Sequence, residues 1–411
     1  MYVMKRNIIV LGGGYDQIGL IQSIRETDKD AYIILVDYFA NPIAKSYADI
    51  HIQESTLDYD VVLALAKKYE IYKIITACTD QALLTMAYVS EELGIPCYIS
   101  YKQALELTNK LYMKEKMVRD SIPTSKHLCV KEGDPVDTSG LTFPLVVKPV
   151  DANSSKGITK ITKVEELDNA MAEAYSYSKT KVAIVEEFVE GEELSVDVFV
   201  ENGVAKLLSV STSLKVKSNF KNFTILHSEF PPTIPYDPEV ITHIAQQIAD
   251  SFCLKDAPLL IQMIVGNGIY SVIEFSARMG GGTKYKLIHT VSGVDIMTEY
   301  VRLVYGMPFS VNPTKACERA RMTYLYCNNG TYASLDNFDN LKEENVIEDY
   351  FVYKQAPSTV TKAENSSDRI AGIMLKADSL DEINAKSEKA ISTLRILNEE
   401  GDDMLKREFY Q

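Results

Sequence analysis

One short segment places side chains suited to a metal ion and to an anion on the same side of a strand. Residues 272–283 read VIEFSARMGGGT. Successive strand residues point to opposite faces, so Glu274, Ser276 and Arg278 are expected together, opposite an apolar face. Oxygen ligands suit Mg²⁺, and a guanidinium binds carboxylates and phosphates. The pattern indicates a metal and phosphoryl-transfer site, although a half-exposed strand with an ion pair has the same pattern.

A second segment combines a strand lysine with a loop suited to phosphate. Residues 145–157 read LVVKPVDANSSKG, with Lys148 in the strand and Ser154, Ser155 and Gly157 in the loop. Hydroxyls and backbone N–H groups of such a loop can surround phosphate oxygens, and the lysine adds a positive charge. The P-loop pattern G-x-x-x-x-G-K-[ST] is absent. A solvated loop beside an edge lysine explains the segment equally well.

A third segment carries acidic residues inside an otherwise apolar strand. Residues 182–193 read VAIVEEFVEGEE. Burying Glu186 and Glu187 costs free energy unless a partner satisfies them. A strand facing a purine, with Glu193 near the ribose hydroxyls, accounts for this placement. An acidic surface turn is the alternative, and it fits Glu190 better than Glu186.

Length and charge limit the possible partners. A chain of 411 residues is expected to form two or three domains. Its 43 basic and 57 acidic residues give a net charge of −14, which argues against nucleic acid and anionic membranes as partners. No apolar run is long enough to cross a membrane, and the N-terminus lacks a signal-peptide pattern. Six dispersed cysteines are typical of reduced thiols in a cytoplasmic protein and argue against structural zinc.

The first 105 residues alternate strands and helices, which predicts a parallel sheet covered on both faces. Its last strand is expected at Pro96–Ile99. Three glycines at positions 12–14 follow the first strand, but the third glycine of a dinucleotide fingerprint is replaced by Gln17. We interpret the glycine turn as a close helix packing site, and a nicotinamide oxidoreductase is disfavoured.

The remainder of the chain reads as α+β. A helix is expected over 108–118, another begins at Asp237-Pro238, and a last one covers 379–399. Asn-Gly pairs at 202–203 and 267–268 predict two tight hairpins. A two-residue turn at the second pair is expected to place Gln262 on the face opposite to Glu274. A three-residue loop is expected to place both side chains on the same face. Lys284 and Lys286 are expected to be solvated helix-surface charges.

Taken together, these motifs resemble those of ATP-grasp enzymes over nearly the whole chain. The resemblance is strongest to the group that includes biotin carboxylase, the carbamoyl phosphate synthetase large subunit and the bacterial L-amino acid ligases. It implies an N-terminal α/β domain over 1–105, an ATP-grasp domain over 106–312 and a mixed C-terminal α+β domain over 313–411. Residues 123–188 correspond to the mobile lid of the ATP-grasp domain.

The resemblance also implies a role for each matching residue. Lys110 and Lys148 match the phosphate-contacting lysines of the family, and Glu274 matches the acid on its magnesium-binding strand. Gln262 stands where a second acid is usual and Ser276 where asparagine is usual, so the site has a single carboxylate. The remaining matches are the phosphate loop (Ser154, Ser155, Gly157), the adenine linker (Glu186, Glu187, Val189), the ribose acid (Glu193) and the substrate contacts (Arg278, Gly281, Gly282). His227, in a segment expected to border the acceptor pocket, is a further candidate substrate contact.

The implied activity is ATP-dependent ligation of a carboxylate to an amine through an acyl phosphate, with release of ADP and phosphate. ATP and Mg²⁺ (or Mn²⁺) are the implied cofactors, with small-molecule carboxylate and amine substrates, and homodimers occur among relatives. A bicarbonate-activating carboxylase or carbamoyl-type enzyme is the enzymatic alternative. An ATP-binding regulator that has lost turnover is a third interpretation, because of Gln262.

Overall fold

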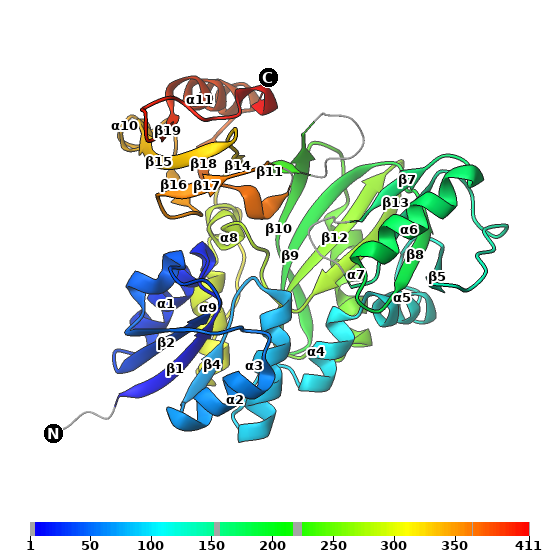
Figure 1. Cartoon of the computed structure of the whole chain (residues 1–411), viewed down its shortest axis with the longest axis horizontal. Coiled ribbons are helices and arrows are strands. Elements are labelled where there is room, and N and C mark those ends of the chain that lie inside the picture. The colour runs from blue at the N-terminus through cyan, green and yellow to red at the C-terminus, as the bar shows by residue number, and fades with distance from the viewer. Residues whose placement is uncertain (1–4, 152–156, 217–223, 364, 411) are drawn as a thin grey trace.

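The computed structural model describes residues 5–151, 157–216, 224–363 and 365–410. Its regions follow the chain in order (Figure 1): an N-terminal α/β unit in blue, a long central sheet in green with a smaller sheet beside it, and a C-terminal unit in orange and red. Within the described residues, no helix is long and apolar enough to cross a membrane.

The N-terminal unit is the expected parallel sheet, with strand order β3-β2-β1-β4. Residues 96–99, expected to be its last strand, are irregular and lead into Ser100, which caps the next helix. The missing strand is replaced at the opposite edge by β3, which pairs with β2. The elements are β1 (Arg6–Leu11), α1 (Tyr15–Thr27), β2 (Ala31–Asp37), β3 (Ile50–Gln53), α2 (Tyr59–Lys68), β4 (Lys73–Ile75) and α3 (Asp80–Leu93).

Two helices connect this unit to the smaller sheet. They are α4 (Tyr101–Thr108) and α5 (Lys110–Arg119). The helix expected over 108–118 is thus interrupted at Asn109, whose side chain accepts a hydrogen bond from the backbone N–H of Tyr112 and caps α5. Lys110 therefore occupies the first position of a capped helix.

The smaller sheet is antiparallel, with strand order β5-β8-β6-β7. One of its faces is covered by α6, where Leu145 and Val147 of β6 pack against Ala170 and Ala174. Its elements are β5 (His127–Lys131), β6 (Leu145–Pro149), β7 (Thr159–Ile161), α6 (Leu167–Tyr177) and β8 (Val182–Glu187). We call this sheet with α6 the lid, following the family term.

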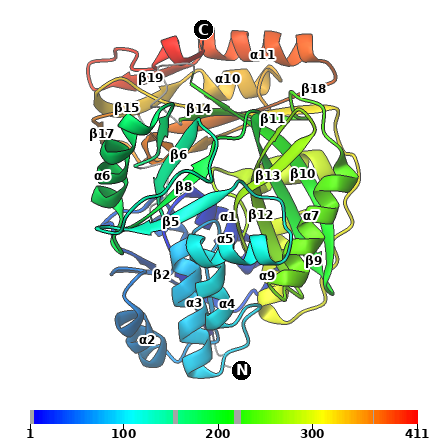
Figure 2. The same ribbon diagram turned by 90° about the vertical axis from the view of Figure 1, so that its right-hand side faces the viewer.

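The central sheet has eight strands, in the order β13-β12-β9-β10-β11-β14-β18-β16. Its first five strands along the chain are β9 (Glu192–Glu201), β10 (Val204–Lys215), β11 (Ile225–Phe230), β12 (Ala257–Gly266) and β13 (Ile269–Ser276). Helix α7 (Pro238–Ser251) begins at Asp237 as expected and buries Ile241, Ile244 and Ile248 against the sheet. In Figure 2, α6 and α7 lie on opposite sides of the view, with the strands of the lid and of the central sheet between them.

Both expected Asn-Gly hairpins form. The residues at 202–203 have φ angles of 53° and 79°, and those at 267–268 have 51° and 77°. These positive φ angles are those that two-residue hairpin turns require. The second turn links Gly266 directly to Ile269 in the β12–β13 ladder.

A β-bulge in β13 changes the expected consequence of that turn. Val272 pairs with Met263, whereas Glu274 pairs with Gln262, so Ile273 is an extra residue on its strand. A bulge shifts the register by one residue and thereby reverses which side chains share a face. The expectation that a two-residue turn separates Gln262 from Glu274 is therefore wrong, and the two side chains share one face.

The C-terminal unit continues the central sheet through β14 (Arg319–Leu325), β16 (Asp349–Val352) and β18 (Ala371–Ala377). A second sheet has the order β17-β15-β19. The last helix ends at Thr393, because residues 395–398 form β19 and pair with β15. The other elements are α8 (Lys284–Ser292), α9 (Ile296–Tyr305), β15 (Gly330–Asp336), α10 (Phe338–Glu343), β17 (Ser358–Val360), α11 (Leu380–Thr393) and β19 (Arg395–Asn398).

Candidate functional site

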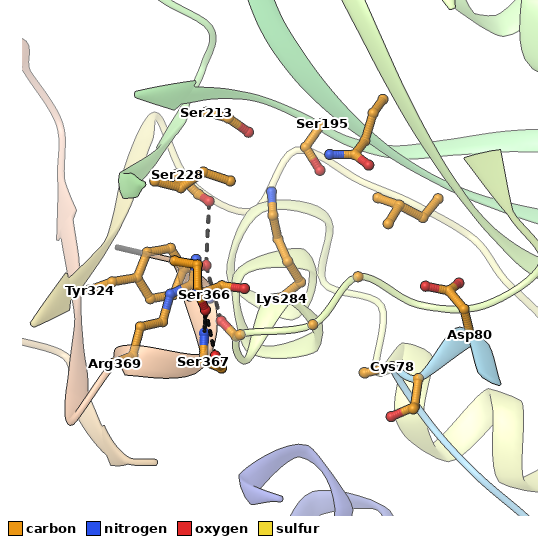
Figure 3. Close-up of a pocket in the computed structure, with 18 of the residues that line it drawn as sticks. Cys78, Asp80, Ser195, Ser213, Ser228, Lys284, Tyr324, Ser366, Ser367 and Arg369 are labelled. Carbon is orange, nitrogen blue, oxygen red and sulfur yellow. Dashed lines mark hydrogen bonds between the residues drawn. The ribbon is translucent and has the colours of Figure 1, made fainter. Parts of the chain in front are cut away.

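All parts of the fold contribute to one large cavity of about 1840 Å³. The N-terminal unit contributes the glycine turn, the loop after β2 and the loop after β4. The lid contributes β6 and the end of β8, and the C-terminal unit contributes residues around Tyr324 and Arg369. Between them lie β9 to β13 and the three glycines. Figure 3 shows the end of this cavity nearest the C-terminal unit.

Lys148 lies in a buried charge cluster between the lid and α5. Its Nζ is 2.5 Å from Oε1 of Glu186, and Nζ of Lys114 is 2.8 Å from Oε2 of the same carboxylate. Ser125 donates a hydrogen bond of 2.7 Å to Oε2 as well. Glu186 thus has two lysine partners, and they explain the acid that the sequence placed inside an apolar strand.

Burial and charge act in opposite directions within this cluster. Burial disfavours the ionised carboxyl of Glu186, but the charges of Lys148 and Lys114 outweigh it and lower the pKa of Glu186. For Lys114, burial outweighs the attraction of Glu186 and lowers its pKa to about 8. Lys114 was not anticipated from the sequence. Its position four residues after Lys110, on the same helix, was the available signal.

Lys110 and Glu274 form an ion pair across the cavity wall. Nζ of Lys110 is 3.1 Å from Oε2 of Glu274, and both residues line the cavity. The residue expected to contact phosphate and the residue expected to hold the metal are therefore adjacent.

The expected nucleotide residues border the same cavity. Glu187 accepts a hydrogen bond of 2.9 Å from the backbone N–H of Thr142, and Val189 lines the wall. Glu193 forms an ion pair of 2.6 Å with Lys215 and accepts a hydrogen bond of 3.3 Å from Nε2 of Gln262.

Of the loop expected to bind phosphate, the structure describes the end that contains Gly157. Gly157 has φ +71°, and a Cβ there would lie 2.7 Å from Tyr177, so the glycine allows close packing against α6. Gly157 is not among the residues that line the cavity, although the next residue, Ile158, is. Ser154 and Ser155 lie outside the described residues.

Two of the three expected metal ligands face the cavity. Gln262 and Glu274 are cross-strand partners and line it. Ser276 corrects the expectation, because its hydroxyl is buried, lies outside the cavity lining and is directed to Asp80, whose pKa it helps to lower. No cluster of three or more His, Cys, Asp or Glu side chains suited to a metal occurs in the described part of the chain. One carboxylate and one amide oxygen fit a Mg²⁺ ion that takes most of its ligands from nucleotide phosphates.

Arg278 is fixed by an acid from the N-terminal unit. Its Nε and Nη2 donate hydrogen bonds of 2.6 Å each to the two oxygens of Asp80, and Nη1 donates one of 2.8 Å to the carbonyl of Met279. Burial would lower the pKa of Arg278, but Asp80 outweighs it and raises the pKa. A guanidinium has five N–H donors, so two remain for a ligand in the cavity.

The end of the segment with three glycines, residues 280–282, is held by Asp16 in the first turn of α1. Its carboxylate accepts hydrogen bonds from the backbone N–H groups of Gly282 (3.2 Å) and Thr283 (2.9 Å). The expectation that the glycine amides contact a substrate is therefore corrected for Gly282, since Asp16 already occupies its N–H group. Gly281 lines the cavity, and a Cβ there would first meet the carbonyl oxygen of Cys78 at 3.6 Å.

Lys284 is buried and lines the cavity, contrary to the expected surface position. Its Nζ donates a hydrogen bond to the hydroxyl of Ser211 and lies 3.8 Å from Oδ2 of Asp197. Burial raises the pKa of Asp197 to about 6, despite the nearby charges of Lys284 and Arg278. The expectation failed because the helix begins inside the fold, between the glycines and β10.

His227 does not line the cavity formed by the described residues. Its Nδ1 is 2.9 Å from the hydroxyl oxygen of Thr323, and its ring centroid is 6.3 Å from that of Tyr410. Burial, together with the charge of Arg321, lowers its pKa to about 3. The imidazole is therefore neutral and packs within the sheet, so its expected contact with substrate is not supported.

Comparison with known proteins finds one matching domain family and several relatives. The ATP-grasp domain family matches residues 141–286. An L-arginine-specific L-amino acid ligase of Bacillus subtilis is 23% identical over 386 residues, covering 89% of this chain and 91% of that protein. A D-alanine–D-alanine ligase of Trichlorobacter lovleyi is 29% identical over 123 residues, or 29% of this chain and 37% of that protein.

Solved structures share the fold over almost the entire chain. A phosphoribosylglycinamide synthetase from Anaerococcus prevotii has a TM-score of 0.76 at 19% identity, covering 96% of this chain and 100% of its own. An L-amino acid ligase from Bacillus licheniformis has a TM-score of 0.76 at 16% identity, covering 97% and 100%.

Residues 141–286 thus match the ATP-grasp domain family, and they lie between an α/β unit and a mixed C-terminal unit in a chain whose fold is shared by the solved structures named above. The proteins similar to it in sequence include an L-amino acid ligase and a D-alanine–D-alanine ligase.

Proposed function

We propose that this chain is an ADP-forming carboxylate–amine ligase that works through an acyl phosphate. A carboxylate oxygen of the donor attacks the γ-phosphorus of ATP, and ADP leaves. The acceptor amine then attacks the acyl carbon, an amide bond forms, and phosphate leaves with the carboxylate oxygen. The amine loses one proton in this step.

One observation carries the proposal: Lys148, Lys110, Glu274 and Arg278 all line the same cavity. Phosphoryl transfer depends mainly on positioning and on neutralisation of charge, because the protein supplies little covalent chemistry. Two lysines, a guanidinium and a carboxylate that can face a cation provide that environment.

Each group has a proposed part in the reaction. Lys148 and Lys110 bind the phosphates, and Glu186 keeps Lys148 in place through their ion pair. Arg278 binds the donor carboxylate with its two free N–H donors, and it stabilises the anionic intermediate formed when the amine attacks. Glu187, Val189 and Glu193 form the proposed nucleotide wall.

Glu274 with Gln262 would hold a Mg²⁺ ion. When bound, the ion neutralises charge on the phosphates. Changing Gln262 to Glu adds a second carboxylate on this face, so we expect the Mg²⁺ concentration needed for half-maximal ATP binding to fall several-fold in calorimetry. Gln247→Glu on α7 is the control. An unchanged Mg²⁺ dependence would argue against this pair as metal ligands.

The proposal is tested by measuring ADP and phosphate release from Mg²⁺-ATP with pooled carboxylic acids and amines. We expect release that needs both co-substrates, and a loss of about a hundredfold or more in Arg278→Ala. Glu274→Ala is expected to lose activity as well. Exposed residues supply the matched controls Arg119→Ala and Glu344→Ala, which should retain wild-type rates. Release of AMP and pyrophosphate would overturn the proposal.

A further inference from the structure

Arg369 lies in the cavity wall and was not anticipated from the sequence. The residue follows a short 3-10 helix at 366–368 in the C-terminal unit and has 8% of its surface exposed. Its guanidinium carbon lies 3.5 Å from the ring centroid of Tyr324, and Nε donates a hydrogen bond of 3.2 Å to the hydroxyl of Tyr326. Stacking on one tyrosine and bonding to another fixes the plane of the guanidinium.

The guanidinium has no anionic partner in the described part of the chain. No Asp or Glu oxygen there lies within 4.0 Å of it. Asp16 is near enough for the positive charge of Arg369 to influence its pKa, but the carboxylate is bonded to Gly282 and Thr283. A buried, unpaired cation is costly unless another group compensates for it.

A second cation lies on the same part of the wall. Lys284 is buried, and the charge of Arg369 contributes to lowering its pKa, after the larger effect of burial and against the attraction of Asp197. In Figure 3, Lys284 lies between the Arg369–Tyr324 pair and Asp80, which holds Arg278. The chain carries a net charge of −14, so two buried cations on one wall are a local exception to its overall negative charge.

Hydroxyl groups and a glycine complete this part of the wall. The hydroxyl of Ser228 lies 3.5 Å from that of Tyr324, which donates a hydrogen bond of 3.1 Å to the carbonyl of Gly282. A Cβ on Gly282 would lie 2.5 Å from Nη1 of Arg369. The glycine therefore leaves the space that the guanidinium occupies beside the cavity.

We propose that Arg369, with Lys284 and the hydroxyl of Ser228, binds an anionic group of the acceptor amine, either a carboxylate or a phosphate monoester. The inference rests on the proposed ligase function and specifies its second substrate. Arg278 is the proposed partner of the donor carboxylate, and Asp80, which holds Arg278, lies on the other side of Lys284 from Arg369 in Figure 3. A second anion subsite therefore suits the other substrate, whose amine must reach the donor.

The test compares acceptors that differ only in the anionic group. Pooled L-amino acids are compared with the corresponding amino acid amides, and ethanolamine phosphate is compared with ethanolamine. The readout is the ratio of kcat/KM for each anionic acceptor to that of its neutral analogue, from ADP release. Hydroxylamine serves as an acceptor without an anionic group and reports acyl phosphate formation by hydroxamate.

We expect the wild type to prefer one anionic series, and Arg369→Gln to reduce that preference roughly tenfold to a hundredfold, the size of a lost charged hydrogen bond. Arg369→Lys should restore part of it. Arg119→Gln, at an exposed site, should leave it unchanged. Whether the amino acids or ethanolamine phosphate shows the preference distinguishes a carboxylate from a phosphate ligand.

Failure of the inference and failure of the ligase function give different results. Hydroxamate formation without any preference for anionic acceptors in the wild type would overturn the inference and leave the ligase function standing. An undiminished preference in Arg369→Gln would also overturn it. Absence of hydroxamate and of ADP release with every donor would overturn both. If Arg369→Gln does not fold, Arg369→Lys and the wild-type comparison still decide the matter.

Discussion

Asp80 and Arg278, 198 residues apart in the chain, form a two-point ion pair with both hydrogen bonds at 2.6 Å. Asp80 is the first residue of α3 in the N-terminal unit, and Arg278 follows β13 of the central sheet. The N-terminal unit thus sets the orientation of the guanidinium proposed to bind the donor carboxylate. This relationship makes Asp80 a positioning residue rather than a catalytic one.

Replacing Asp80 with Asn should therefore weaken donor binding while ATP binding persists. The variant keeps the side-chain volume but removes the charge that orients Arg278, so we expect the donor KM to rise about tenfold or more. The free energy of unfolding should fall by about 1–3 kcal/mol, measured by urea denaturation. Asp402→Asn, at an exposed site, is the control. A fall in kcat alone, with an unchanged donor KM, would contradict this role.

Lys114 predicts a pH dependence of nucleotide binding. Because the pKa of Lys114 is about 8, the cluster that it forms with Lys148 and Glu186 loses one positive charge as the pH rises from 7 to 9. We expect the Kd for ATP, measured by calorimetry, to rise several-fold between pH 7 and pH 9. Lys114→Met should remove most of this change. An equally steep change in that variant would contradict the assignment.

The lowered pKa of Lys114 affects stability in the opposite direction: a rise in pH weakens ATP binding but increases the free energy of unfolding. Between about pH 8 and pH 10.5 the unfolded chain still binds the proton that Lys114 has lost in the folded protein. The contribution of this lysine to the free energy of unfolding therefore rises with pH across that window. Urea denaturation of the wild type and Lys114→Met at pH 8 and pH 10 measures the difference.

Alanine substitutions at Gly282 and Gly306 distinguish a steric clash of the added Cβ from strain in the backbone. Their φ angles are +73° and +69°, but a Cβ at Gly282 meets Arg369 and Tyr324, whereas a Cβ at Gly306 meets nothing within 4 Å. Gly306→Ala should cost about 1 kcal/mol of stability through strain in the left-handed region. Gly282→Ala should cost more and should weaken acceptor binding, measured as KM. Equal effects of the two changes would contradict the packing described at Arg369.

Local patterns predicted much of the fold, because each depends on neighbouring residues. The parallel N-terminal unit, both Asn-Gly hairpins and the helix at Asp237 follow from strand alternation, turn chemistry and capping. The expected strand at Pro96–Ile99 was wrong, because a short apolar run does not determine whether a neighbouring strand is available to pair with it. The partner edge of β4 has no such strand among the described residues.

The contacts that orient the candidate site were not predictable from sequence. Asp16 reaches Gly282 across 266 residues, and the pairs of Asp80 and Lys114 likewise depend on how separate units pack. The bulge at Ile273 was not predictable either. Counting residues around the turn gives the wrong face for Gln262, because the extra residue lies within the strand and leaves the turn unchanged.

The most direct test of the acyl phosphate follows an oxygen atom. The donor acid identified by the ADP-release screen is labelled with ¹⁸O in its carboxylate and incubated with Mg²⁺-ATP and the acceptor. We expect one labelled oxygen to appear in the released phosphate, because the carboxylate oxygen that attacks the γ-phosphorus leaves with it. Label in AMP, or unlabelled phosphate alongside amide product, would contradict the proposed mechanism.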